Sequence, residues 1–389
     1  MRVDDLAERH RRGELSPDEQ AEYGGYVYFD SFVAILKSKA RQLRIGVIHM
    51  HLRNLSLLAL LILVPAMAST AEPPGIPDGW SDGYVYANGA RLHYYHAVPA
   101  PEKPVIVMVH GVTDIGLSWT TLTWRLQDDY DVYMLDTRSH GLSDPITTAD
   151  DGDTLIKDVV EFVKVMEFDK PILMGHSMGG ATVIRVGAEY PDLAKAIVVL
   201  DAGIGGPGGG RGRGRRGPGA GRAAPQGGQR GAQAQGAERG GPPPARPSES
   251  SAPDNLSVSM FGTPETLVAQ NNYSFEDLVA TGQRRHPKWD IVDNQYWALS
   301  KKQYHGAYSR EMFAVMSGSM RTGDSLAKIP VPTLILKADA PPEVREAHKE
   351  TVSEMPRVKL VHIDDAGHNL HHDQLDRTVD VVMEYLSTL

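Results

Sequence analysis

The stretch Pro171-Ile-Leu-Met-Gly-His-Ser-Met-Gly-Gly180 decides the fold. It starts as a short apolar run, continues as Gly175-His176-Ser177-Met178-Gly179, and passes into a helix-forming segment that extends to Tyr190. A serine on a tight strand-to-helix turn takes a strained backbone conformation, so the residues two positions before and after it must be small. Both are glycine here. We therefore predict a turn of the nucleophile-elbow type, with Ser177 at its tip.

Such a turn has a chemical use. It lifts the hydroxyl above the edge of a sheet and points the N-terminus of the following helix at it. The backbone amide of Met178 is then available to bind a developing oxyanion. A bare G-x-S-x-G pattern is weak evidence, but the apolar run before it and the helical stretch after it are the context that the motif requires.

Composition limits the possible classes of protein. The chain has 389 residues, a net charge of -9 and 41% hydrophobic residues. That is enough for one large core with an inserted lid, or for two small domains. The acidic balance argues against a dedicated nucleic-acid-binding protein. Cysteine is absent, which excludes disulfides, thiolate chemistry and Cys-ligated metals.

Apolar strands alternate with helical segments along most of the chain. Asn88-Gly89 separates two strand-like runs and predicts a hairpin with a two-residue turn. Later apolar runs show no polar alternation, which is typical of strands buried on both faces of a parallel sheet. We predict these buried strands at 104–110, 132–135, 171–175, 194–200, 332–337 and 359–363. The alternation favours an α/β fold with a doubly wound, mostly parallel sheet.

The N-terminal part contains a candidate export signal. Met50-His-Leu-Arg53 is basic, the next ten or so residues are apolar, and Ala66-Met67-Ala68 matches a cleavage site. We expect a signal peptide that starts at Met50 and is cleaved after Ala68, and thus a periplasmic or secreted protein without a stable membrane span. The alternatives are an uncleaved signal that anchors the chain in a membrane, or a buried helix. N-terminal sequencing of exported protein distinguishes these possibilities.

The remaining organisation follows from composition. A Gly-, Arg- and Pro-rich segment cannot form a core and is expected to be a disordered insert; it lacks the aromatic residues of an RNA-binding arm. An aromatic-rich helical segment follows, whose inner face is expected to line an apolar pocket. The expected divisions are a charged helical extension at 1–49, the signal peptide at 50–68, a leader at 69–83, the first core part at 84–201, the insert at 202–255, the lid at 256–325 and the second core part at 326–389.

Four motifs occur in the order and spacing of the α/β-hydrolase family, which the chain resembles over about residues 84–386. They are His110-Gly111, Asp136-x-Arg138-x-His140-Gly141-x-Ser143, Gly175-x-Ser177-x-Gly179 and Gly367-His368. The chain order Ser…Asp…His is the one that this fold uses.

The resemblance implies a catalytic triad. Ser177 would be the nucleophile and His368 the general base, with the backbone amides of Val112 and Met178 as oxyanion donors. Asp339 stands where the family usually places the acid, after the strand that follows the lid. However, the usual nearby glycine is replaced by Lys337-Ala338. Asp201, after the strand that follows the elbow, is the alternative acid; Asp339 is the preferred one.

Other polar residues have plainer interpretations. Arg138, His140 and Ser143 are expected to brace their loop, and His176 to pack under the elbow. His371 and His372 do not have the spacing of a known metal motif. No cofactor and no metal are expected.

The resemblance implies acyl transfer to water, with a small ester-like molecule as substrate. A carboxylic ester is the leading hypothesis; amide or peptide bonds, lactones and C–C bonds remain open. A serine nucleophile argues against the epoxide hydrolases and haloalkane dehalogenases, which use aspartate. Two other classes compete: a ligand-binding protein on this fold without catalysis, and an interaction protein that acts through the Arg/Gly-rich insert. No nucleic-acid partner is expected. Deleting residues 203–247 separates the last class, because an esterase keeps most of its turnover and an arm-based binder loses its partner.

Overall fold

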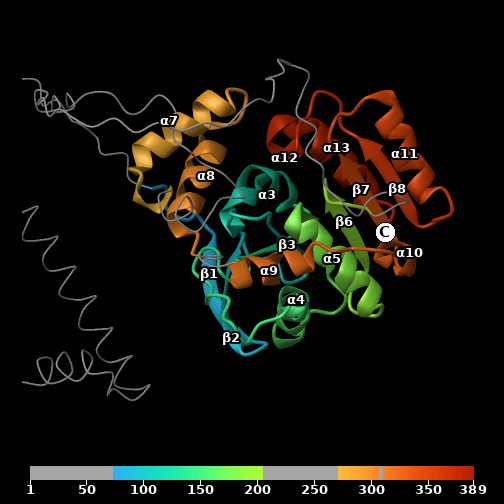
Figure 1. Ribbon diagram of the computed structural model, residues 1–389, viewed down its shortest axis with the longest axis horizontal. Coiled ribbons are helices and arrows are strands. Elements are labelled where there is room, and N and C mark those ends of the chain that lie inside the picture. The colour runs from blue at the N-terminus through green and yellow to red at the C-terminus, as the bar shows by residue number, and fades with distance from the viewer. Residues whose placement is uncertain (1–72, 205–269, 306–309) are drawn as a thin grey trace, which may run out of the picture. The chain divides into compact units, whose positions relative to one another are not determined.

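The computed structural model describes residues 73–204, 270–305 and 310–389 (Figure 1). The expected N-terminal extension, the signal peptide, the start of the leader, nearly all of the insert and the start of the lid lie outside the described residues. In the described part, no helix combines the length and apolar character needed to cross a membrane.

An eight-stranded sheet forms the centre of the molecule, in the order β1-β2-β4-β3-β5-β6-β7-β8. The first three strands in this order pair antiparallel, and every pair from β4 onward is parallel. This confirms the predicted α/β fold with a mostly parallel sheet. The strands span β1 Ser81–Ala87, β2 Ala90–His96, β3 Val105–Val109, β4 Asp131–Leu135, β5 Ile172–His176, β6 Ala196–Leu200, β7 Thr333–Lys337 and β8 Val358–His362.

The predicted hairpin is formed by β1 and β2. Ala87 pairs directly with Ala90, so Asn88 and Gly89 are the two turn residues. Their φ angles of 47° and 73° are both positive. Asparagine and glycine tolerate this left-handed conformation better than other residues, and the two-residue turn of this kind matches the twist of the strands.

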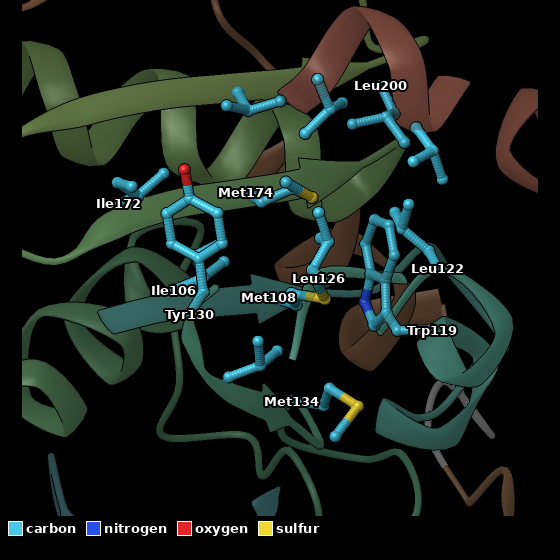
Figure 2. Packing of buried hydrophobic residues seen from close by; sticks show 14 of the residues in the cluster. Ile106, Met108, Trp119, Leu122, Leu126, Tyr130, Met134, Ile172, Met174 and Leu200 are labelled. Carbon is cyan, nitrogen blue, oxygen red and sulfur yellow. The ribbon is translucent and has the colours of Figure 1, made fainter. Parts of the chain in front are cut away.

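Helices cover both faces of the sheet, and the alternation of side chains along each strand supplies both cores. In β3, Ile106 and Met108 face one core while Val107 and Val109 face the other. The first core also contains residues of α3 (Thr120–Leu126) and α13 (Leu375–Leu386). Figure 2 shows part of it, with Trp119 beside the methionines of the central strands. The second core contains residues of α4 (Thr154–Val165) and α5 (Met178–Glu189), with α11 (Pro342–Val352) against its margin.

Four helices lie between β6 and β7 in the chain: α7 Phe275–Arg285, α8 Ile291–Gln303, α9 Arg310–Ser319 and α10 Ser325–Lys328. Ser274 caps the start of α7, because its side chain accepts a hydrogen bond from the amide of Asp277. Helix α8 is tied to the core: Tyr296 joins the first core, and Asp293 accepts a buried hydrogen bond of 2.9 Å from Thr121. The segment therefore packs on the sheet domain through polar as well as apolar contacts.

Two helical stretches are divided. Residues 116–126 begin as the 3-10 turn η1 (Gly116–Trp119) before α3, and the closing helix α13 is preceded by the short α12 (Leu370–Asp373). The backbone breaks at Gln374, whose φ of -140° is not helical. The break lets α12 hold the loop that carries His368 while α13 packs along the sheet.

Candidate active site

The elbow has the predicted strained geometry. Ser177 lies between the end of β5 and the first residue of α5, with φ 52° and ψ -111°. A Cβ atom at Gly175 would meet the backbone of Gly179 and Gly180, and one at Gly179 would meet the carbonyl oxygens of Val109 and His110. Only glycine fits at these two positions. The flanking glycines therefore allow the turn that raises the Ser177 hydroxyl to the edge of the sheet.

His368 reaches this hydroxyl from the far end of the chain. Its Nε2 lies 2.9 Å from Ser177 Oγ. The His368 side chain is 37% exposed when only the described residues are considered. The imidazole accepts the serine proton at Nε2, because its Nδ1 faces a carboxylate and must carry hydrogen there.

That carboxylate belongs to Asp201, and the preference for Asp339 as the acid is wrong in this structure. His368 Nδ1 donates to Asp201 Oδ2 at 2.7 Å. Asp339 instead binds the Arg345 guanidinium at 2.5 Å and accepts from the amide of Asp365 at 3.0 Å. Its side chain is 41% exposed.

The positions of the two aspartates relative to their strands explain why Asp201 is the acid. Asp201 directly follows β6, and its φ of 45° turns the side chain in from the sheet edge. Asp339 stands two residues beyond the end of β7, and its amide donates to the carbonyl of Ala366. Asp339 thus supports the loop that leads to His368 through its backbone, and its carboxylate points to the surface pair with Arg345.

The charge of Asp201 is well compensated. Burial by itself would raise the pKa of this carboxyl, but the hydrogen bond from His368 and the charge of Lys337 hold its pKa far below the usual range. Lys337 Nζ lies 2.7 Å from Asp201 Oδ1. Asp201 is therefore an anion throughout the physiological pH range, as the acid member of a triad must be.

His176 does more than pack under the elbow. It is buried at the end of β5, and its Nε2–H donates to the backbone carbonyl of His368 at 2.9 Å. Burial and the neighbouring His368 lower the pKa of His176 to about 4, so it stays neutral and keeps one fixed tautomer. The residue next to the nucleophile thus anchors the loop that carries the base.

The loop after β3 holds the expected oxyanion donor Val112. The Gly111 carbonyl accepts from His110 Nδ1 at 2.7 Å and from the amide of Asp114 at 3.1 Å. Because a trans peptide places its oxygen and its N–H on opposite sides, the Val112 N–H points away from these donors. Met178, the first residue of α5, belongs to the same buried cluster as Val112. Both amides therefore come from rigid segments beside Ser177.

Thr113 is held on both sides. Its φ is 64°, and its amide donates to Nε2 of His140 at 3.1 Å. The Nζ of Lys301, from α8, donates to the Thr113 carbonyl and hydroxyl, each at 2.9 Å. Lys301 is 3% exposed; burial lowers its pKa, while Asp114 at 3.7 Å opposes that shift. A buried lysine of the helical segment therefore fixes the oxyanion loop.

The Asp136–Ser143 loop braces the site, as predicted. Arg138 binds Asp158 with contacts of 2.6 Å and 3.1 Å, and Asp150 at 2.7 Å. Ser143 Oγ accepts from the amide of His93 and donates to the carbonyl of Asp136. These side chains bind backbone groups and carboxylates of the loop and of the segments next to it.

The two histidines after His368 also have structural partners. His371 packs on Trp119 with ring centroids 4.9 Å apart, and burial keeps its pKa well below the usual value. His372 lies 3.0 Å from Asp293. Among the described residues, no group of three or more His, Asp or Glu side chains has a geometry that could hold a metal ion.

Three functional positions escaped sequence reasoning: Lys301, Lys337 and the contact of His176 with the base loop. Their partners lie 135 to 192 positions away in the chain, so no local pattern marks them. Lys337 had one signal, since it replaces a glycine expected near the acid. That substitution pointed to an altered environment there without showing which aspartate it served.

Comparison with known proteins identifies the family. A model of the alpha/beta hydrolase family matches residues 106–381, which include Ser177, Asp201 and His368. The chain belongs to this family.

The relatives differ in chemistry. Residues of this chain are 33% identical over 127 residues to N-formylmaleamate deformylase from Pseudomonas putida, covering 32% of this chain and 47% of that protein. The identity to 2-(acetamidomethylene)succinate hydrolase from Mesorhizobium japonicum is 31% over 98 residues, or 25% of this chain and 35% of that protein. Epoxide hydrolase 1 from Caenorhabditis elegans is 27% identical over 129 residues, or 33% and 32%. These matches span about a third to a half of each relative.

Solved structures extend the likeness of fold over more of the chain. A crystal structure of E-2-(acetamidomethylene)succinate hydrolase superposes with a TM-score of 0.54 and 17% identity, covering 79% of this chain and 99% of that one. The similarity at this identity concerns the fold.

Proposed function

We propose that the protein hydrolyses a carboxylic ester through an acyl-enzyme on Ser177. One observation carries the proposal: the continuous chain from Ser177 Oγ to His368 Nε2 at 2.9 Å and from His368 Nδ1 to Asp201 Oδ2 at 2.7 Å. This is the arrangement by which a base removes a hydroxyl proton while a carboxylate fixes its tautomer.

In the proposed reaction, Ser177 Oγ attacks the acyl carbon and its proton passes to His368 Nε2. The carbonyl oxygen becomes an oxyanion that the amides of Val112 and Met178 bind. When the tetrahedral intermediate collapses, the C–O bond to the alcohol breaks and His368 protonates the departing oxygen. A water molecule then gives a proton to His368 and attacks the acyl-enzyme, which releases the acid and restores the serine.

Serine chemistry favours acyl groups over epoxides, although an epoxide hydrolase is among the relatives. An oxygen nucleophile that opens an epoxide forms a C–O bond to an alkyl carbon. If the nucleophile is a carboxylate, the product is an ester that water can cleave. If it is Ser177, the product is an ether, which the triad cannot hydrolyse.

A small amide is the second candidate. Two relatives above 30% identity are named a deformylase and an acetamidomethylene hydrolase. The same triad serves amides if His368 protonates the leaving nitrogen. Esters and amides therefore belong in the same first assay.

The test is a panel of p-nitrophenyl esters of increasing acyl length, with N-formyl and N-acetyl amides in parallel. Labelling with a fluorophosphonate probe shows whether Ser177 is activated, and Ser177→Ala is the matched control. We expect saturable ester hydrolysis and labelling of the native chain alone. The proposal fails if the native chain neither turns over an ester nor takes up the probe.

A further inference from the structure

Lys337 is the last residue of β7, and it occupies the side of the triad acid that faces away from His368. Its Nζ lies 2.7 Å from Asp201 Oδ1 and 3.0 Å from the carbonyl of Ala202. Both side chains of the pair are largely buried, with 12% and 13% of their surfaces exposed. The amide of Ala338 donates to the same oxygen at 3.2 Å. Each carboxylate oxygen of Asp201 thus has its own partners: Lys337 and Ala338 hold Oδ1, and His368 takes Oδ2.

Of the ionisable groups near Asp201, Lys337 supplies the permanent positive charge in direct contact with its carboxylate. Four other histidines lie near the triad or Lys337. His176 from β5 lies beside His368, and His371 from α12 lies beside His176. His348 from α11 and His362 from β8 contact each other near Lys337. Burial is the main cause that lowers the pKa of each, so they are neutral near pH 7.

The remaining nearby cation is committed elsewhere. The guanidinium of Arg345 binds Asp339 and Asp364, at 2.5 Å and 2.6 Å. These three side chains form a separate ion-pair group in which two carboxylates share the charge of Arg345. The carboxylate of Asp201 is therefore opposed by Lys337 directly.

This placement separates two tasks of a triad acid. An aspartate orients the imidazole through its hydrogen bond, and its negative charge stabilises the imidazolium. A lysine on the opposite oxygen strengthens the first task, because it fixes the rotation of the carboxylate. It weakens the second, because a positive charge close to the imidazole disfavours protonation of that ring.

We propose that Lys337 is a positioning residue that locks the carboxylate of Asp201 toward His368 and, by its charge, offsets part of the negative charge that Asp201 presents to the base. The proposal rests on the proposed function of the triad. Its consequence is a pH profile whose acidic limb depends on the charge at position 337.

The pH profile of kcat/KM tests the charge. In Lys337→Gln, a neutral donor replaces the ammonium, and we expect the acidic limb to move upward by roughly 1 to 2 pH units. This is the effect of a unit charge roughly 6 Å from the imidazole at an effective dielectric constant of about 20 to 40. Lys337→Arg keeps the charge and should leave the limb within about 0.3 pH unit of wild type. A role in hydrogen bonding alone predicts no shift in the glutamine variant and overturns the proposal.

Lys359→Gln is the matched control. Lys359 lies on the neighbouring strand β8, is 44% exposed and pairs with Glu384 at 2.8 Å, away from the triad. Its loss changes the net charge by the same amount and should not move the limb. An equal shift in this variant overturns the proposal, because it assigns the effect to overall charge. If Lys337→Gln does not fold, Lys337→Met, which keeps an unbranched side chain without its charged end, is read in the same way.

An NMR titration of the His368 ring in wild type and Lys337→Gln gives a second reading that needs no turnover. Without ester hydrolysis or fluorophosphonate labelling, the proposed function fails, yet the titration midpoints still decide the role of Lys337. With hydrolysis present and equal midpoints in both proteins, only the role of Lys337 fails.

Discussion

Two turns at the carboxyl edge of the sheet carry the nucleophile and the acid of the triad, and they are built differently. The turn after β5 is shaped by its own residues, since Gly175 and Gly179 let the backbone close around Ser177. The turn after β6 depends on its neighbours: Asp201 is held by His368 from beyond β8 and by Lys337 and Ala338 from β7. The nucleophile is therefore a local feature, whereas the acid is a feature of the assembled sheet edge.

The largest effect should come from the turn that is locally defined. We expect Ser177→Ala to lower kcat by about 10⁴-fold or more, because the covalent route is lost while the backbone stays in place. The same holds for His368→Ala. Steady-state kinetics on the best ester of the panel measures this, and a circular dichroism spectrum like that of wild type verifies the fold. Residual activity above about a tenth of wild type would mean that the hydrolysis occurs elsewhere.

Exchanging the two candidate acids tests the turn that depends on its neighbours. Asp201→Asn should lower kcat by about 10⁴-fold, because an amide no longer imposes the correct tautomer on His368. Asp339→Asn alters an exposed pair with Arg345 and a hydrogen bond from the Asp365 amide that an asparagine oxygen can still accept, so it should keep kcat within about threefold. The reverse pattern would return the role of the acid to Asp339.

The buried His176 at the end of β5 predicts a pH dependence of stability. The pKa of His176 is about 4 in the folded protein against 6.5 ordinarily, so above pH 6.5 the residue is neutral in both states. As the pH falls from 6.5 to 4, the unfolded chain takes up a proton that the folded one resists. The free energy of unfolding then drops by about 3 kcal/mol from this group alone. The buried His110, His140 and His371 shift in the same direction.

Urea unfolding at pH 7.5 and 4.5 measures this loss. His176→Gln can still donate to the His368 carbonyl but carries no titrating ring, so its stability should fall less between the two pH values. An identical loss in both proteins would show that His176 is not the source.

The smallest effect concerns the oxyanion loop. Lys301→Met removes both hydrogen bonds to Thr113, and we expect kcat to fall about 10-fold to 100-fold with little change in KM, since an oxyanion donor acts in the transition state. Thermal stability should fall as well, because the Thr113 carbonyl and Asp114 lose their buried partner. Lys302→Met, on the same helix but bonded to Asn271 and Tyr273, is the control. Equal kcat in wild type and Lys301→Met would remove Lys301 from the machinery.

Most of the sheet was predictable because its signals are local. Buried strands show as continuous apolar runs, and Asn88-Gly89 marks a turn that few other residue pairs permit. The split of the 117–126 helix was not predictable, because its residues suit both a 3-10 and an α turn. The prediction of Asp339 as the acid was wrong because it used only the position of each aspartate after its strand. The directions of the two side chains depend on their contacts with Arg345 and Lys337.

The sequence alone determined the α/β architecture, the elbow at Ser177 and the need for His368, since glycine spacing, apolar periodicity and motif order are properties of short segments. Only the tertiary structure decided that Asp201 is the partner of His368, that His176 anchors the base loop and that Lys301 and Lys337 flank the site. The physical reason is distance along the chain. A hydrogen bond between residues such as Asp201 and His368 depends on how strands align at one sheet edge, and no local pattern records that alignment.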